Sequence, residues 1–165
     1  MKMVIRSANP SDIPNLLPMI AKTCALHQSW DAAKYGSVPH PERLYLDWLA
    51  RLLKNQRNLC LIAEVLTEGT QASPKLIALL IATVEREIPM YSLKEFGFIH
   101  DLWVDPEYRH LGYARQMVKQ TIAHFTQIGI KQIRLDTASV NDVARKLFAS
   151  IGFRPSQIEM LLELE

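Results

Sequence analysis

The residues from Arg109 to Ala114 have the composition of an anion-binding turn. They follow an apolar, strand-like run from Phe98 to Val104 and open a helix-like run that reaches Ile128. The first N–H groups of a helix have no partner within the helix, and the helix dipole adds partial positive charge there. Gly112 allows the backbone to approach an anion closely, and Arg109 adds a fixed positive charge. The stretch therefore predicts a phosphate or pyrophosphate site, although its spacing alone has low specificity.

Composition limits the classes of fold and function that the chain could have. It has 165 residues and a formal net charge of +2, so we expect residues 1–165 to form a single domain with a substantial core. The basic residues are scattered, which argues against nucleic acid or an anionic membrane surface as the main partner. No apolar run is long enough to cross a membrane, and the N-terminus lacks the apolar core of a signal peptide. The two cysteines have no C-x-x-C spacing and are expected to be buried free thiols, which favours a reducing compartment, the cytoplasm.

The positions of apolar residues and of turn formers predict the elements that must hold this turn. In the first half, the expected elements are a strand at Met3–Ser7, a helix from the Asn9 or Ser11 cap to Cys24 with a kink or later start at Pro18, a loop from His27 to Pro41, a helix at Pro41–Asn55, and strands at Leu59–Leu66 and Leu76–Val84 joined by the loop Thr67–Pro74. In the second half they are a strand at Phe96–Val104, a helix from Ala114 to Ile128, a strand at Ile133–Leu135, a helix at Asn141–Ile151 and a closing strand at Gln157–Leu164.

Two motifs and this order of elements together indicate a family. The run Leu102–Tyr108 joins the apolar strand to the turn Arg109–Ala114. Further along, Asn141, Ala144 and Phe148 are spaced to share one helical face, which Gly152 ends. In this combination the chain resembles the GNAT (GCN5-related N-acetyltransferase) family over essentially its whole length.

The resemblance implies a fold and a co-substrate. The fold is of the α/β (α+β) class, with a mixed, mostly antiparallel central sheet flanked by helices and splayed between the fourth and fifth strands. Acetyl-CoA would lie in the gap of the splay, and no metal is implied. The residues that the resemblance assigns to the co-substrate are Leu102, Trp103 and Val104 on the strand, Arg109, His110, Leu111, Gly112, Tyr113, Ala114 and Arg115 at the turn, and Asn141 and Phe148 on the later helix. Asn141 would alternatively serve only as the N-cap of its helix.

Acetyl transfer to an amine needs a neutral amine, a polarised carbonyl and a proton for the departing thiolate. A backbone N–H near Val104 is expected to polarise the carbonyl. His100 and Asp101 are polar residues inside an otherwise apolar strand, where burial costs free energy unless they are paired or used. His100 occupies the position of a catalytic histidine in the arylalkylamine N-acetyltransferases, and the pair resembles the Glu-Asp pair of the diamine acetyltransferases.

Both residues are therefore candidate catalytic groups, with His100 suited to accept a proton near pH 7. Neighbours on a strand point to opposite faces, so one pocket receives both only if a bulge redirects one of them. The family has a bulge near this position. The structural alternative is a core histidine that bonds a backbone carbonyl. His27 and His40 flank the loop expected to roof the acceptor site, whereas His124 is expected at or near the surface.

The sequence departs from the family pattern at Phe148, where many members have a tyrosine whose hydroxyl protonates the thiolate. Phenylalanine donates no proton, so water or another residue would have to do so.

The leading hypothesis is transfer of acetyl to a primary amine of a small molecule by direct attack in a ternary complex. The alternatives are a protein lysine or N-terminal acetyltransferase and an acyl-CoA-binding regulatory module without catalysis. The apolar run Ile158–Leu164 is expected either to join the core or to pair two copies into a homodimer.

Overall fold

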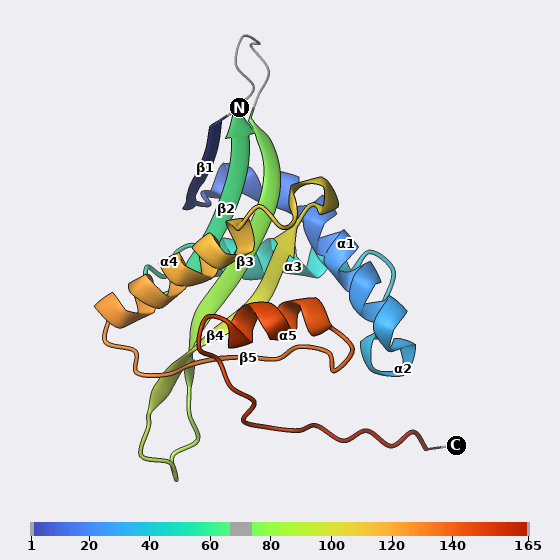
Figure 1. The fold of residues 1–165 in the computed structure, drawn as a ribbon, viewed down its shortest axis with the longest axis vertical. Coiled ribbons are helices and arrows are strands. Elements are labelled where there is room, and N and C mark those ends of the chain that lie inside the picture. The colour runs from blue at the N-terminus through green and yellow to red at the C-terminus, as the bar shows by residue number, and fades with distance from the viewer. Residues whose placement is uncertain (1, 67–73, 165) are drawn as a thin grey trace.

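The computed structural model describes residues 2–66 and 74–164. Most of the predicted loop Thr67–Pro74 lies outside them. The elements, in chain order, are β1 (Lys2–Ser7), η1 (Pro10–Asp12), α1 (Ile13–Trp30), α2 (Ala32–Tyr35), η2 (Pro41–Leu44), α3 (Tyr45–Leu52), β2 (Leu59–Leu66), β3 (Lys75–Arg86), β4 (Glu95–Val104), η3 (Pro106–Tyr108), α4 (Tyr113–Gln127), β5 (Ile133–Leu135) and α5 (Asp142–Ala149) (Figure 1).

The strands form one sheet in the order β1-β2-β3-β4-β5. The first three pairings are antiparallel, and β4 pairs with β5 in parallel. This confirms the predicted mixed, mostly antiparallel sheet. The β4–β5 pairing begins at Gly97 with Ile133 and ends at Ile99 with Leu135. From His100 to Val104, β4 is paired on one side only within the described residues, so the predicted splay between the fourth and fifth strands is confirmed.

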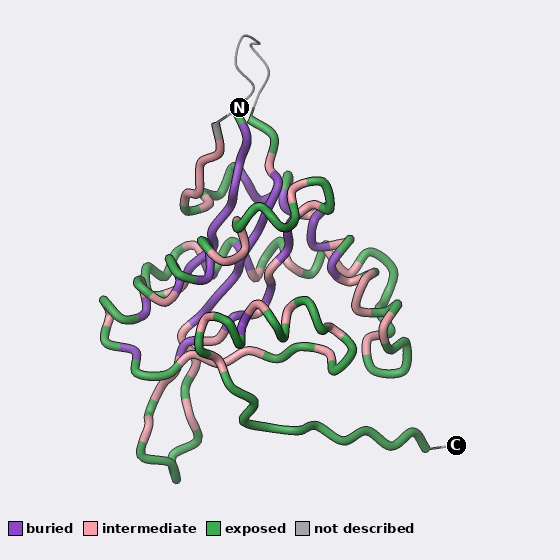
Figure 2. The backbone as a smooth tube through the Cα atoms, in the orientation of Figure 1, coloured by how far each residue is buried: buried purple, intermediate pink, exposed green. Residues whose placement is uncertain are grey.

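The sheet separates two apolar cores. On one face, α1 and α3 pack through Leu16, Ile20 and Leu49, all nearly inaccessible to solvent. On the other face lie α4, which buries Phe125 completely, and α5. Residues 77–82 of β3 are all buried because both faces of this strand are covered (Figure 2). None of the helices within the described residues is both long and apolar enough to cross a membrane.

Gly97 sets the packing at the point where β4 meets β5. A Cβ atom at this position would lie 2.6 Å from two ring atoms of Phe125, well inside van der Waals contact. The N–H of Gly97 donates to the carbonyl of Gln132 at 2.9 Å, which leads the chain into β5. A glycine is therefore required where the sheet approaches α4 most closely.

Two sequence predictions for the N-terminal half need correction. The helix α1 begins at Ile13 and continues through Pro18 to Trp30, so it does not start later at Pro18. Its buried face on the sheet outweighs the one backbone hydrogen bond that a proline removes. The expected loop from His27 to Pro41 contains the last turn of α1 and the short helix α2. Asp31 caps α2 by accepting from the N–H of Lys34 at 3.1 Å.

The predicted closing strand at Gln157–Leu164 is wrong. This segment forms no strand, and its apolar side chains at Ile158, Met160, Leu162 and Leu164 are 83–87% exposed. Its alternation of apolar and polar residues is that of a strand, but β5 has only three residues and offers it little edge to pair with. Pairing of this run with a second copy of the chain stays a prediction.

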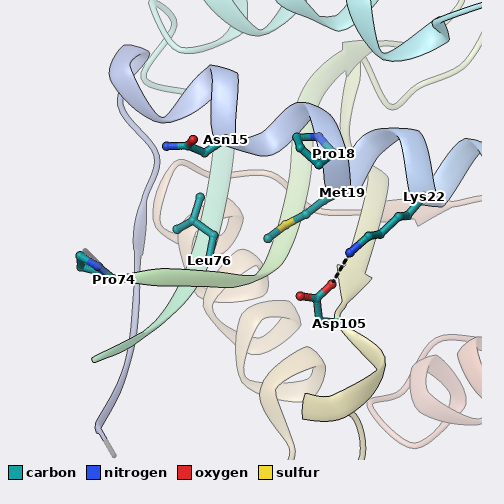
Figure 3. A pocket seen from close by; sticks show the side chains of 7 residues that line it. All are labelled: Asn15, Pro18, Met19, Lys22, Pro74, Leu76 and Asp105. Atoms are coloured by element: carbon teal, nitrogen blue, oxygen red, sulfur yellow. Dashed lines mark hydrogen bonds and ion pairs between the residues drawn. The ribbon is translucent and has the colours of Figure 1, made fainter. Parts of the chain in front are cut away.

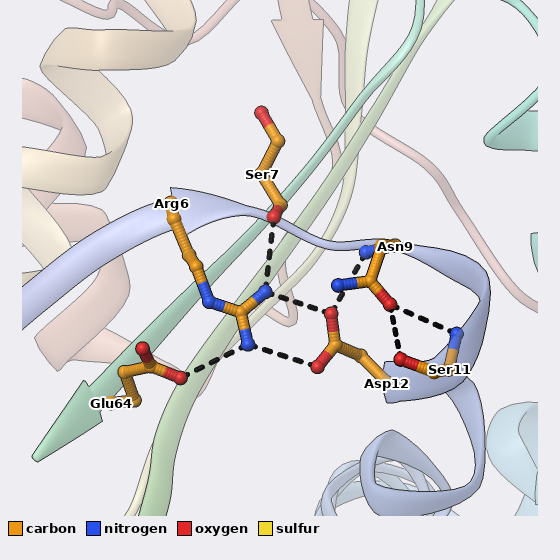
Figure 4. A network of polar contacts seen from close by, with 6 residues as sticks. All are labelled: Arg6, Ser7, Asn9, Ser11, Asp12 and Glu64. Carbon is orange, nitrogen blue, oxygen red and sulfur yellow. Dashed lines mark hydrogen bonds and ion pairs between the residues drawn. The ribbon is translucent and has the colours of Figure 1, made fainter. Parts of the chain in front are cut away.

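An ion network ties the first strand to the sheet and to the start of α1 (Figure 4). The Arg6 guanidinium donates to both carboxylate oxygens of Asp12, at 2.8 and 3.0 Å, and to Glu64 at 3.0 Å. Asp12 also accepts from the N–H of Asn9 at 2.8 Å, as part of a capping box. Both carboxylates are buried, and the hydrogen bond from Arg6 is the main cause that lowers the pKa of Asp12.

We expect Asp12→Asn to lower the free energy of unfolding at pH 7 by about 1–3 kcal/mol, because Arg6 loses a charged partner in a buried site. A pKa that is lowered in the folded state stabilises the fold above the unfolded-state pKa and ceases to do so as pH falls through the folded-state pKa. The difference between wild type and variant should thus be constant from pH 7 to 5 and shrink below pH about 4. Urea titrations at several pH values measure it.

The matched control is Asp142→Asn, which removes a carboxylate paired with Arg145 on the exposed surface of α5. This change should alter stability by less than about 0.5 kcal/mol. Equal effects of the two substitutions at pH 7 would show that the buried network has no special role.

Candidate active site

A β-bulge on β4 brings the two candidate catalytic residues to the same face of the sheet. Ile99 is paired with Ala82 and Asp101 with Ile81, so His100 is the extra residue on β4. Its ring packs edge-on against Trp48 of α3, with ring centroids 5.1 Å apart. Asp101 accepts a hydrogen bond from the Tyr45 hydroxyl, also on α3, at 3.3 Å. The bulge that a shared pocket requires is therefore present, and it reverses the alternation of the strand from this point on.

A cavity of about 270 Å³ opens where β4 and β5 separate. It extends from one face of the sheet to the other through the splay. The α1 and α2 side is lined by Thr23, His27 and Tyr35, and the α5 side by Asn141, Ala144 and Phe148; between them are Phe98–Leu102 of β4 and the residues Leu135–Ala138 that begin at the end of β5. His100 and Asp101 both line it.

Asp101 titrates in an unusual range. Its side chain is buried, and this burial raises the pKa of the carboxyl to about 6, with the hydrogen bond from Tyr45 acting weakly in the opposite direction. The same environment raises the pKa of the Tyr45 phenol above its usual value, mainly through burial and then through the Asp101 charge. At pH 7 Asp101 is thus largely an acceptor, and it takes up a proton under mildly acidic conditions.

His100 bonds a side chain, not a backbone carbonyl. Its Nε2 lies 2.7 Å from Oγ1 of Thr83 and 3.6 Å from Oε1 of Glu85. Burial lowers the pKa of the imidazole, and the nearby Glu85 carboxylate partly offsets this. The ring is therefore neutral at pH 7, which is the form that accepts a proton.

The other histidines have different surroundings. His27 lines the cavity, where its ring packs against those of Trp30 and Tyr35 at 5.3 Å each, and burial lowers its pKa. His40 has a left-handed backbone and lies 3.4 Å from the Glu42 carboxylate. His124 contacts the carbonyl of Arg57 at 3.1 Å and is not part of the cavity lining.

The predicted anion-binding turn has the backbone geometry that such a site needs. His110 and Gly112 both have positive φ, 63° and 85°, with Leu111 between them. Along the chain, Gln116 has the first backbone N–H of this region that makes a helical hydrogen bond, which it donates to the carbonyl of Gly112 at 3.0 Å. Within the described residues, the preceding N–H groups of Tyr113, Ala114 and Arg115 have no backbone acceptor. These groups are available to an anion at the N-terminus of α4.

The two arginines of this region make contacts of their own. The Arg109 side chain turns back along β4, where Nε donates to the Val104 carbonyl at 2.9 Å and the guanidinium lies 5.0 Å from the centre of a ring of Trp103. Arg115 donates to the Ser150 hydroxyl at 2.7 Å and thereby joins α4 to the end of α5. Arg109 thus anchors the turn to the strand, and Arg115 holds the two helices together.

Two predicted residues on α5 face the cavity. Asn141 accepts from the N–H of Ala144 at 3.1 Å, so it is the N-cap of this helix, and its position in the cavity lining leaves the second role open. Phe148 is buried and packs against Phe153 with ring centroids 5.3 Å apart. No hydroxyl stands at this place.

A larger hollow, about 440 Å³, lies between α1 and the strand end that leads to η3 (Figure 3). Among its lining residues the charged side chains are Lys22 and Asp105, which pair with each other at 3.3 Å. Asp105 also accepts from the indole N–H of Trp103 at 3.1 Å. Because these charges satisfy one another, the smaller cavity at the splay is the better candidate for chemistry.

Three residues that contact His100 or Asp101 from other elements are not singled out by the sequence, namely Tyr45, Trp48 and Thr83. Tyr45 and Trp48 lie in the helix predicted at Pro41–Asn55, and no local pattern connects these two residues with β4. Thr83 was overlooked as well, although a signal existed, because Thr83 and Glu85 are two apart on a strand and so face the same side.

The comparisons with known proteins agree with this geometry. The family model described as Acetyltransferase (GNAT) family matches residues 24–153. An aminoglycoside N(6')-acetyltransferase type 1 from Acinetobacter genomosp. 13 is 25% identical over 144 residues, covering 87% of this chain and 92% of that protein.

Solved structures share the fold. A mutant of the BH1408 protein from Bacillus halodurans matches with a TM-score of 0.80 at 19% identity, covering 98% of this chain and 99% of that one. A protein from Clostridium acetobutylicum described as a predicted acetyltransferase, solved with acetyl-CoA, matches with a TM-score of 0.74 at 20% identity, covering 98% of this chain and 96% of that one. Because the family model spans most of the chain and the splayed sheet is present, the chain belongs to the GNAT acetyltransferase family and is an N-acetyltransferase.

Proposed function

We propose that the protein transfers the acetyl group of acetyl-CoA to a primary amine of a small molecule, by direct attack while both substrates are bound. The observation that carries this proposal is the cavity at the splay, which is lined by His100 and Asp101 of β4 and by Asn141 and Phe148 at α5. A cavity lined by residues from both faces of the sheet would allow two substrates to meet from opposite sides. Its acid–base groups then lie beside the meeting point.

The residues of the chain fit acetyl-CoA. From Leu102 to Val104, β4 has no strand partner on its splayed side within the described residues. Apart from the Val104 carbonyl, which accepts from Arg109, the main-chain groups on this side are available to an extended pantetheine arm. The free N–H groups at the start of α4 and the positive φ at Gly112 suit a pyrophosphate. When bound there, acetyl-CoA supplies an activated acetyl group as a thioester.

His100 is proposed as the base. Its neutral ring accepts a proton from the attacking amine, either directly or through a water. The amine nitrogen bonds the carbonyl carbon, and the carbon–sulfur bond breaks, so that the electron pair leaves with sulfur. The thiolate then takes a proton from water or from the His100 imidazolium, because Phe148 has none to give.

The surroundings of the cavity favour a small cationic amine. Asp101 and Glu85 place carboxylates near His100, and the aromatic side chains of Tyr35 and Trp48 flank the same region. The matched relative named an aminoglycoside N(6')-acetyltransferase makes amino sugars a natural acceptor class to test. Protein lysines and N-terminal amines are the second candidate class of acceptor. However, α2 contributes Tyr35 to the cavity lining and so narrows the route by which a protein substrate would reach the cavity.

Both cysteines are free thiols, in keeping with action in the cytoplasm.

With acetyl-CoA and a panel of amines, we expect thiol release that depends on the amine and saturates in both substrates. The panel should contain an aminoglycoside, a diamine, an arylalkylamine and lysine-containing peptides, with product mass as a second readout. Small cationic amines should exceed the peptides in kcat/KM by at least about tenfold, since the cavity leaves little room for bulky groups around the amine.

Preference for the peptides would instead assign the protein class of acceptor. Tight binding of CoA with no thiol release from any amine would indicate a binding module and contradict the proposal.

The two candidate bases can be separated by their variants. His100→Gln should lower kcat/KM at pH 7 by about a hundredfold and remove the acidic limb of its pH profile. Asp101→Asn should lower kcat/KM less and leave the acidic limb in place, because His100 would still have to be deprotonated to act as the base. If Asp101→Asn removes the limb and His100→Gln does not, Asp101 is the base.

We expect Phe148→Tyr to keep or raise kcat, because a hydroxyl at the cavity wall would supply a proton to the departing thiolate. Steady-state kinetics with a saturating amine measure this, and thermal unfolding checks that the buried hydroxyl is tolerated. Phe153→Tyr is the matched control, since Phe153 packs against Phe148 but does not line the cavity. A clear fall in kcat for Phe148→Tyr alone, at unchanged stability, would argue that the thiolate needs no acid here.

A further inference from the structure

Behind His100, a chain of two side chains on β3 leads from the imidazole to solvent. Resting on the proposed role of His100 as the base, we propose that Thr83 and Glu85 are positioning residues that hold His100 in the tautomer with its proton on Nε2. The lone pair of Nδ1 is then the one that receives the proton from the acceptor amine. Neither β3 residue touches the reacting atoms in this account.

The geometry is set by the strands. Thr83 and Glu85 lie on the same side of β3, and the bulge on β4 turns His100 toward them. Oγ1 of Thr83 lies 2.5 Å from Oε1 of Glu85 and 2.7 Å from Nε2 of His100. Thr83 is itself buried, whereas the Glu85 side chain is 45% exposed. The hydroxyl is therefore enclosed between two fixed partners.

The direction of the hydrogen bonds follows from the chemistry of the three groups. An ionised carboxylate only accepts, so the single proton of the Thr83 hydroxyl is donated to Glu85. The hydroxyl oxygen is then left to accept, and the group that faces it, Nε2 of His100, must donate. A neutral imidazole has one N–H, so Nδ1 carries no proton.

The ring is held in place on its other sides. Trp48 packs edge-on against it with centroids 5.1 Å apart, and Phe98 packs against it at 4.9 Å. Among the described residues, no buried side-chain nitrogen or oxygen lacks a hydrogen-bond partner, and the hydrogen bond of the His100 ring is the one to Thr83. Nδ1 is therefore in reach of solvent or substrate, as a base must be.

The tautomer can be read directly by long-range proton–nitrogen NMR of the protein labelled with 15N-histidine, at a pH where His100 is neutral and without any substrate. In the wild type, we expect Nε2 to carry the proton. Thr83→Val removes the acceptor while keeping the shape of the side chain. It should shift the ratio of tautomers by about two- to tenfold, which corresponds to the loss of one hydrogen bond. Thr83→Ser keeps the hydroxyl and should retain the wild-type spectrum.

Glu85→Gln gives a sharper test, because an amide also donates. If its N–H₂ group donates to Thr83, the hydroxyl proton turns toward His100 and favours the other tautomer, with the proton on Nδ1. Glu87→Gln is the matched control, since Glu87 lies just beyond β3 and pairs with Arg134 instead. It should leave the His100 signals unchanged.

Thr83→Val and Glu85→Gln should lower kcat/KM by about the factor that the tautomer shift predicts, with the KM for acetyl-CoA unchanged. The pH profile should be interpreted with the other titratable groups near the ring in mind, namely Asp101 on the same strand, Tyr45 on α3 and Glu85 itself.

A wild-type spectrum with the proton on Nδ1, or no change in Thr83→Val, would overturn the inference even if the enzyme is active. Lack of thiol release from every amine would overturn the proposed function but leave the measured tautomer as it is. A tautomer shift in Thr83→Val with unchanged kcat/KM would show that the chain positions the ring without serving catalysis.

Discussion

The backbone hydrogen bonds between β4 and β5 end at Ile99 and Leu135, and the site depends on this ending. If β4 and β5 continued to pair in parallel, their backbone hydrogen bonds would close the gap between the two strands. Where the ladder stops, the strands diverge, and β4 keeps free main-chain groups on one edge inside the protein. Such groups are costly to bury without partners, so a ligand that pairs with them is favoured. The cavity follows from that one interruption, and so do the proposed edge for the co-substrate and the proposed meeting point of two substrates.

The bulge at His100 lies directly after the last β4–β5 pair, and the two irregularities act together. Strand alternation alone would send His100 and Asp101 to opposite faces. The extra residue places both on the face that α3 covers, where Tyr45 and Trp48 meet them. Burial there raises the pKa of Asp101 and lowers the pKa of His100.

The rest of the molecule holds this irregular region by regular means. At the far edge of the sheet, Arg6 binds two buried carboxylates and fixes β1 and the start of α1 to β2. On the opposite face, Gly97 lets α4 pack closely at the start of the β4–β5 pairing, and Arg115 ties α4 to α5. The walls of the cavity are thus carried by elements whose own positions are fixed by charge pairs and tight apolar packing.

The sequence by itself indicated the family and the order of most elements, because these depend on local periodicity and on short motifs such as Arg109–Ala114. The resemblance to the family then implied the mixed sheet with its splay. The sequence also singled out His100 and Asp101, since polar residues in an apolar strand are conspicuous. It failed at Gln157–Leu164, where a strand pattern finds no edge to pair with, and at α1, where packing on the sheet overrides Pro18. Only the tertiary structure decided that a bulge turns both polar residues to one face, and which groups meet them. Tyr45, Trp48, Thr83 and Glu85 come to His100 and Asp101 from other elements, and contacts between segments distant in the chain leave no periodic signal in the sequence.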